Sequence, residues 1–287
     1  MINLSELKQL LSLEKIKDNN FTGQNYKTEW GRVFGGQVLG QSLHAAYQTV
    51  PEDRIAHSMH GYFILGGDIN VPINYHVDNI RDGKSFTTRR VIAYQKGKAI
   101  FIMAASFQLN QEGVNHQINM PNVLTPDLLL TDLQQAINIK KIDSERYEKI
   151  LKSHPKVFEF KPVEKATFLQ TRNSLPKSHV WFKTKEKVNA KISFQHQLLA
   201  FASDYSLLLT STLPHREKLF GKKIFYASLD HAIWFHRQFK IDEWLLYSMQ
   251  SPSASNSRGF TLGKIFNQAG EMVASVSQEG LIRSYKQ

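Results

Sequence analysis

The chain has 287 residues, of which 41% are hydrophobic, and this is enough to bury one large core or two ordinary ones. It contains no cysteine, which excludes disulfides, thiolate nucleophiles, iron–sulfur clusters and cysteine-ligated zinc. The formal charge is +11, but the lysines are scattered and form no stripe with interleaved aromatic residues, so we predict no nucleic-acid partner.

The N-terminal residues predict an amphipathic helix, with Leu4, Leu7 and Leu11 on one face. This segment lacks the basic-then-apolar layout of a signal peptide. No apolar run approaches the length that a bilayer span needs, and residues 284–287 are not a peroxisomal address. We therefore expect a cytoplasmic protein without membrane insertion.

Two stretches of the chain show the same order of expected elements, a helix followed by four strands. In the first stretch these are a helix over 35–47 and strands over 58–65, 71–79, 85–95 and 98–109. In the second they are a helix over 197–210 and strands over 223–236, 242–250, 258–267 and 271–282. Hairpin turns close both stretches, at Lys96-Gly97 and at residues 268–270.

This order predicts an α+β protein made of two units, residues 1–110 and 156–287. Residues 111–155 are interpreted as a linker, because periodicity lapses there, with a polar helix over 137–151. Two such units can pair their sheets edge to edge, which covers both edges and leaves a seam where a site can form.

Asp204 is the most unusual residue of the second helix, which is apolar on nearly every side. It is the only carboxylate between Lys187 and Arg216. Burial of an ionised carboxylate is costly unless partners surround it. Asp204 is therefore either paired structurally, which is the commoner situation, or a general base in a dry cleft with a raised pKa.

The histidines give no support for a metal site. His231 and His236 are five residues apart on an expected strand, so their side chains face opposite sides, and no His-Glu-x-x-His helix occurs. We interpret them as hydrogen-bonded histidines of the core or of the seam, and we predict no metal.

Five segments of the sequence match the pattern of a known family, and they do so in the same order over nearly the whole chain. They are residues 33–46, 81–91, 229–237, 242–247 and 273–283. On these segments the chain resembles the acyl-CoA thioesterase II (TesB-like) family, whose members are double hotdog proteins. The resemblance implies two fused hotdog units, each an antiparallel sheet wrapped around a long helix. It also implies hydrolysis of fatty acyl-CoA, of medium to long chain and broad range, to free fatty acid and CoA. The partner is then the acyl-CoA substrate, with no separate cofactor, and the chains are expected to form a dimer or tetramer.

The same resemblance implies a catalytic set of Asp204, Ser228 and Gln278, with Ser228 standing where the family pattern usually has Thr. Asp204 would take the proton of a water molecule that Ser228 and Gln278 orient. The serine keeps the hydroxyl but lacks the β-branch that stiffens the side chain. No serine or cysteine nucleophile is needed, and the chain has no Gly-x-Ser-x-Gly motif. Backbone N–H groups at a helix start, with Gly35-Gly36 as candidates by position, would meet the oxyanion.

The first helix carries no acid, and an offset of 160 between Val38 and Leu198 places His44 at the Asp204 position. One active site per chain is therefore expected. Two alternatives stay open at this stage. One is a hotdog hydratase, for which Asp230-His231 is the local His–acid candidate. The other is a non-catalytic acyl-CoA binding protein in which Asp204 is only a structural partner.

Overall fold

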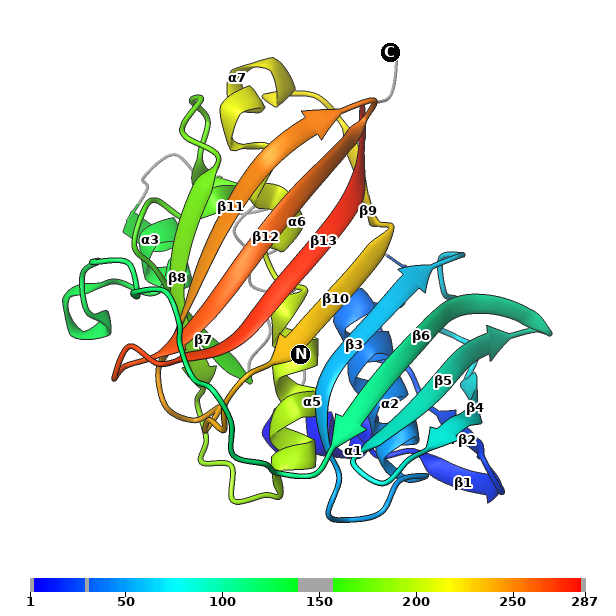
Figure 1. Cartoon of the computed structure of the whole chain (residues 1–287). Coiled ribbons are helices and arrows are strands. Elements are labelled where there is room, and N and C mark those ends of the chain that lie inside the picture. The colour runs from blue at the N-terminus through cyan, green and yellow to red at the C-terminus, as the bar shows by residue number, and fades with distance from the viewer. Residues whose placement is uncertain (1–2, 29–30, 139–156, 285–287) are drawn as a thin grey trace.

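A computed structural model describes residues 3–28, 31–138 and 157–284. The described residues form one antiparallel sheet of 13 strands, with two neighbouring helices, α2 and α5, behind it in the view of Figure 1. The strand order is β1-β2-β4-β5-β6-β3-β10-β13-β12-β11-β8-β7, and β9 pairs with β13 outside this path. Strands of the N-terminal half thus occupy one side of the sheet, and those of the C-terminal half the other.

The elements of the N-terminal half are α1 (Leu4–Leu11), β1 (Glu14–Lys17), β2 (Asn20–Gly23), α2 (Gly35–Tyr47), β3 (Ile55–Phe63), β4 (Ile73–Asp82), β5 (Phe86–Gln95) and β6 (Lys98–Gln108). Between the halves lie η1 (Pro126–Leu128) and α3 (Asp132–Asn138). The elements of the C-terminal half are β7 (Phe158–Pro162), η2 (Thr167–Leu169), β8 (Lys177–Thr184), α5 (Ile192–Ser203), α6 (Leu207–Thr210), η3 (Leu213–His215), α7 (Arg216–Leu219), β9 (Ile224–Ser228), β10 (Asp230–Phe235), β11 (Leu245–Ser255), β12 (Arg258–Asn267) and β13 (Met272–Ser284).

The order of helix and strands predicted for each half is confirmed, with differences in detail. The sequence missed β1, β2, β7 and β8, three of which are only four or five residues long and too short to show a clear period. The run predicted over 223–236 is two strands, which separate at Leu229. The helix predicted over 137–151 lies almost entirely outside the described residues, and the unit boundaries at 110 and 155 stay a prediction.

The two halves meet where β3 pairs with β10. Met59 lies opposite Ile233 in this antiparallel register, and both side chains are fully buried. One hydrophobic core extends through both halves. The edge-to-edge pairing predicted from the sequence is therefore confirmed, and it leaves neither β3 nor β10 as an open edge.

Helices α2 and α5 pack against each other in opposite directions, with glycines at the points of closest approach. A Cβ atom added to Gly36 would lie 2.3 Å from the carbonyl oxygen of Phe201, closer than van der Waals contact permits. One turn further on, a Cβ on Gly40 would lie 3.2 Å from the carbonyl oxygen of Gln197. Small residues at these positions set the distance between the helices, and hence the position of the α5 end relative to the α2 start.

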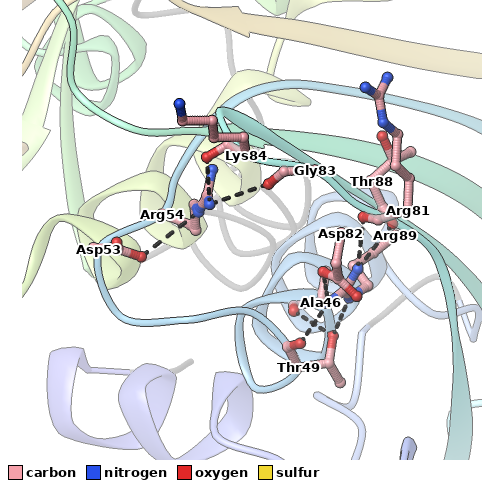
Figure 2. Close-up of polar contacts among 10 residues, drawn as sticks. All are labelled: Ala46, Thr49, Asp53, Arg54, Arg81, Asp82, Gly83, Lys84, Thr88 and Arg89. Carbon is pink, nitrogen blue, oxygen red and sulfur yellow. Dashed lines mark hydrogen bonds and ion pairs between the residues drawn. The ribbon is translucent and has the colours of Figure 1, made fainter.

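The C-terminal end of α2 is held by a buried arginine (Figure 2). Arg89 is 2% exposed and donates to the Thr49 carbonyl oxygen at 2.8 Å and to Asp82 Oδ1 at 2.7 Å. A cation is favourable beside the negative end of a helix dipole, and the Asp82 carboxylate balances its charge. These bonds tie the β4–β5 hairpin, which contains the sequence segment 81–91, to the end of α2.

The prediction of one continuous helix over 197–210 is wrong, because the structure has two helices there. α5 ends at Ser203, Asp204 is its C-terminal cap, and α6 starts at Leu207. Between them Ser206 adopts φ 63°, a left-handed conformation that stops an α-helix and is costly for a residue other than glycine. Asp204 therefore lies at the end of a helix, so its side chain is not confined to a row of side chains along the helix surface.

No helix in the part of the chain that the structure describes is long and apolar enough to cross a lipid bilayer.

Candidate active site

A cavity of about 750 Å³ lies beside the junction of α5 and α6 and takes walls from both halves of the chain. Its walls are mainly apolar, and they include Val33, Phe34, Val38, Phe63, Ile64, Leu65, Ile100, Phe160, Phe168, Leu208, Leu209 and Phe225. Asp204, Ser228 and Gln278 contribute polar atoms to the same wall. The three residues implied by the sequence resemblance thus come together in one apolar cavity, the usual setting of a small-molecule site.

The Asp204 carboxylate is buried and hydrogen-bonded on both oxygens, with 6% of its side chain exposed. Oδ1 accepts from Gln278 Nε2 at 2.6 Å and from Ser228 Oγ at 3.4 Å, and Oδ2 accepts from the Gly36 N–H at 3.0 Å. Burial raises the pKa of Asp204, and these three hydrogen bonds offset part of that rise. The carboxylate is therefore both positioned and made more basic than a solvated one.

The start of α2 meets Asp204 directly. A Cβ atom on Gly35 would lie 2.6 Å from Asp204 Oδ2, so only glycine fits there. Because the Gly36 N–H already donates to Asp204, its prediction as a free oxyanion donor is wrong. Gly35 lines the cavity, and its N–H finds no acceptor among the described residues.

The His231 ring is hydrogen-bonded to the side-chain amide of Gln278. The ring is fully buried, which lowers the pKa of His231 to about 3 and keeps the ring neutral. Nδ1 lies 3.1 Å from Gln278 Nε2, which can only donate, so Nδ1 accepts and the ring proton is on Nε2. Nε2 in turn lies 2.9 Å from Ser203 Oγ. The prediction of a hydrogen-bonded core histidine is confirmed for His231, although its link to Gln278 was not visible in the sequence. His236 is also hydrogen-bonded, with Nε2 2.8 Å from Ser275 Oγ, but it is exposed and does not belong to the core.

The side-chain amide of Gln278 is unevenly paired: its Nε2 has more acceptors within reach than it has hydrogens, and its Oε1 has no donor among the described residues. Its Nε2 lies within 3.1 Å of Asp204 Oδ1, Ser228 Oγ and His231 Nδ1, but carries two hydrogens. Its buried Oε1 has no donor among the described residues, and neither does the buried hydroxyl of Thr261 find a partner there. Thr261 lies directly opposite Gln278 in the β12–β13 register. Sequence reasoning missed Thr261, since only the long-range register brings it to the site.

The Asp230-His231 pair that a hydratase would need is not formed. Neighbouring residues on a strand face opposite sides, and Asp230 Oδ1 instead accepts the Glu279 N–H at 2.7 Å. His231 contacts Gln278 and Ser203. The structure thus removes the candidate on which the hydratase alternative depended.

The position matching Asp204 in the first half is Tyr47, not His44. The helices start at Gly35 and Ile192, so their offset is 157 (192 − 35) instead of the predicted 160. The sequence match of Val38 with Leu198 gave the wrong register because apolar residues recur along both helices. The expectation that the first half lacks an acid at this point holds with either residue.

Comparison with known proteins gives the family. The model described as acyl-CoA thioesterase matches residues 154–281, and the one described as acyl-CoA thioesterase N-terminal domain matches residues 26–108. Acyl-CoA thioesterase 2 of Haemophilus influenzae is 39% identical over 285 residues, which cover 98% of each chain. The chain belongs to the acyl-CoA thioesterase family. Its predicted enzyme class, acyl-CoA hydrolase, is confirmed.

Solved structures agree with this assignment. The acyl-CoA thioesterase II TesB2 of Mycobacterium marinum is 38% identical, with a TM-score of 0.79 and coverage of 98% of this chain and 99% of that one. A protein of Alicyclobacillus acidocaldarius described as having a hot dog fold is 15% identical, with a TM-score of 0.75 and 98% coverage of both chains. The second likeness shows the fold alone, and together they confirm the predicted double hotdog class.

Proposed function

We propose that this chain hydrolyses fatty acyl-CoA with Asp204 as the general base. The observation that carries the proposal is a buried carboxylate of raised pKa in the wall of a large apolar cavity. Asp204 takes a proton from water, whose oxygen attacks the thioester carbonyl carbon. The tetrahedral oxyanion then collapses, the carbon–sulfur bond breaks, and the proton passes from Asp204 to the CoA thiolate. The products are the free acid and CoA.

Gln278 and Ser228 orient the base and the water. Gln278 donates to Asp204 Oδ1, and Ser228 Oγ bridges Gln278 Nε2 at 3.0 Å to the same carboxylate oxygen. When a water molecule competes for Asp204, Gln278 has Ser228 and His231 as alternative acceptors, so no buried donor loses its partner. The two residues therefore keep hydrogen-bond partners whether or not a water molecule binds to Asp204.

The Gly35 N–H is our candidate for the oxyanion donor. It is the first N–H of α2, where the helix dipole favours negative charge, and Gly35 lines the cavity next to Gly36, whose N–H anchors Asp204. One preorganised donor of this kind contributes about 3 kcal/mol to transition-state stabilisation in acyl transfer.

The apolar walls support an acyl chain of medium to long length. Phe160, Phe168 and Leu208 form an apolar wall beside Asp204 and offer no charged partner to the chain. Burial of each CH₂ group contributes about 0.8 kcal/mol, so KM should fall as the chain lengthens until the cavity is filled. Assembly into a dimer or tetramer and a cytoplasmic location stay predictions from the sequence resemblance.

The decisive experiment is thiol release from acyl-CoAs of short, medium and long chain by wild type and Asp204→Asn. We expect kcat to fall by about 100-fold or more in the variant, the range of a lost general base. Asp230→Asn is the matched control, since Asp230 is a nearby acid that does not line the cavity. Equal turnover by Asp204→Asn and wild type would disprove the role of Asp204. Tight acyl-CoA binding without turnover by wild type would support the binding-protein alternative.

A further inference from the structure

The cavity follows strand β9 residue by residue. Every position from Phe225 to Leu229 contributes to its wall, although alternate residues of a strand point to opposite faces. This pattern is explained if the cavity borders the edge of the strand. β9 pairs with β13 on one side, and no described strand pairs with its other edge.

The hydrogen-bond alternation shows which backbone groups face that free edge. The Leu229 N–H donates to the Glu279 carbonyl oxygen of β13 at 2.9 Å, but the Leu229 carbonyl accepts the Phe63 N–H of β3. The register of β9 is set by Ile282, which lies opposite Tyr226 and donates its N–H away from β9, to the Ser257 carbonyl oxygen at 2.7 Å. In an antiparallel ladder the bonded residues alternate, so Ala227 and Phe225 direct their N–H and C=O groups to β13. Tyr226 and Ile224 then direct theirs to the free edge beside the cavity, where an extended ligand can pair with them.

A basic segment lies just before β9. Residues 216–223 carry Arg216, Lys218, Lys222 and Lys223. The one acid of the segment, Glu217, accepts from Asn173 Nδ2 at 3.0 Å. On the facing wall the Arg32 guanidinium lies 4.8 Å from the ring centroid of Phe225.

Arg216, at the start of this segment, has guanidinium N–H groups that lack an acceptor within the described part of the chain. Its Nε and Nη2 atoms are buried without an acceptor among the described residues, and the guanidinium interacts electrostatically with Tyr226. Guanidinium N–H groups without acceptors are costly to bury, and because Arg216 as a whole is only half-buried, a turn of its side chain toward an anionic ligand would satisfy them.

The distances match the CoA part of the substrate. From Ser228 to Lys223 the strand covers five residues, or about 16 Å at the rise of an extended chain. The pantetheine arm of CoA contains two amide units and roughly thirteen bonds from sulfur to the first phosphorus, which corresponds to about 15 Å at peptide dimensions. A thioester at Asp204 with its arm along β9 therefore brings the phosphates to the basic segment.

We propose that the CoA moiety lies along the free edge of β9, its pantetheine amides paired with backbone groups of Tyr226 and its phosphates bound by Arg216, Lys222 and Lys223. Arg32 closes the opposite side. The assignment rests on the proposed function in one respect, the thioester position beside Asp204. It leaves the Phe160 and Phe168 side of the cavity for the acyl chain.

The phosphate part is tested with two substrates of the same acyl chain, acyl-CoA and acyl-pantetheine, which lacks the phosphates. Arg216→Gln and the double variant Lys222→Gln/Lys223→Gln should each raise KM for acyl-CoA about tenfold, the effect of losing charge-assisted hydrogen bonds. Neither should change kinetics with acyl-pantetheine. The control Lys185→Gln/Lys187→Gln removes the same charge as the double variant, but from exposed lysines that precede α5. It should leave both KM values unchanged.

An unchanged KM for acyl-CoA, or an equal loss with acyl-pantetheine, would overturn the phosphate assignment. If wild type hydrolysed neither substrate, the proposed function would fail separately. Calorimetric titration with CoA would then still decide the assignment, because the double variant should bind CoA about tenfold more weakly than the control.

The strand-edge part is tested by Tyr226→Pro against Tyr226→Ala. Both variants lose the side chain, but only proline removes the N–H that faces the free edge, and the ladder to β13 is kept. KM for acyl-pantetheine should be about fivefold higher in the proline variant, with equal melting temperatures, for the loss of one hydrogen bond. Equal KM values in the two variants would reject the pairing with β9.

Discussion

The two ends of the α2–α5 helix pair are built alike but filled differently. At one end Asp204, which caps α5, contacts Ser228 at the end of β9 and borders the cavity. At the other end Tyr47, the last residue of α2, contacts the Ala56 N–H near the start of β3. Asp204 accepts the N–H of Gly36 from the partner helix, whereas the Tyr47 hydroxyl lies 2.9 Å from His196 Nδ1.

Aromatic rings occupy the Tyr47 end. His196 stacks on Phe235 at a centroid distance of 4.0 Å, and Tyr47 contacts Phe107 edge to face at 5.0 Å. Burial lowers the pKa of His196 to about 3, so the ring is a neutral acceptor. The repeated scaffold provides, in each half, a helix end that faces the partner helix, and the side chains placed there decide between an open cavity and a filled aromatic core.

Among substitutions of the residues around Asp204, Gly35→Ala has the largest expected effect. The added methyl group would lie 2.6 Å from Asp204 Oδ2 and must displace the carboxylate. Since a displacement of about 1 Å can cost 100-fold in rate, kcat should fall by that order. Steady-state thiol release measures it, with Gly113→Ala, in open space, as control. An unchanged kcat would mean that the close approach of α2 to Asp204 has no role in catalysis.

At the opposite end, Tyr47→Phe should affect stability and leave kcat unchanged. The buried Ala56 N–H loses its acceptor and His196 Nδ1 loses its donor, which should cost about 2 kcal/mol in the free energy of unfolding. Urea unfolding measures the loss. A large fall in kcat with normal folding would show that the Tyr47 end takes part in the reaction and would end the contrast between the two ends.

The titration of Asp204 should change activity and stability in opposite directions. Its folded pKa lies above the usual carboxyl value, so the folded state binds the proton more tightly than the unfolded chain. Stability therefore falls as pH rises from about 4 through the raised pKa, whereas kcat/KM rises as the base forms. Urea unfolding and thiol release between pH 4 and 8 test this, and Asp204→Asn should lack the stability slope. A slope that persists in the variant would assign it to another group.

The smallest effect concerns Thr261. Thr261→Val keeps the shape and removes a buried hydroxyl that has no partner among the described residues. Stability should rise by about 1 kcal/mol, the cost of an unsatisfied buried group. The paired substitution Gln278→Leu tests the neighbouring oxygen. If Thr261→Val instead lowered kcat and left stability unchanged, the hydroxyl would be a positioning group for Gln278.

The three residues that the resemblance implied lie together, whereas the path of the chain through them differs from the prediction. Asp204 stood out because a lone acid in an apolar segment needs a reason, and the hairpins at Lys96-Gly97 and residues 268–270 were readable from turn chemistry. The helix break at Ser206 was not, since a left-handed serine has no local signature. The Thr261 neighbour of Gln278 depends on cross-strand register, which long-range pairing sets.

The join of β3 to β10 has a consequence for fragments of this chain. A C-terminal fragment keeps Asp204, Ser228 and Gln278 but leaves β10 as an open edge and lacks the Gly36 N–H that anchors the carboxylate. An N-terminal fragment has the reverse defects. Val114, at 102% exposure, is a site where a break should be tolerated, and co-expressed fragments cut there should recover activity that neither has alone. The half without an acid thus remains indispensable, because both the pairing partner of β10 and the N–H that anchors Asp204 come from it.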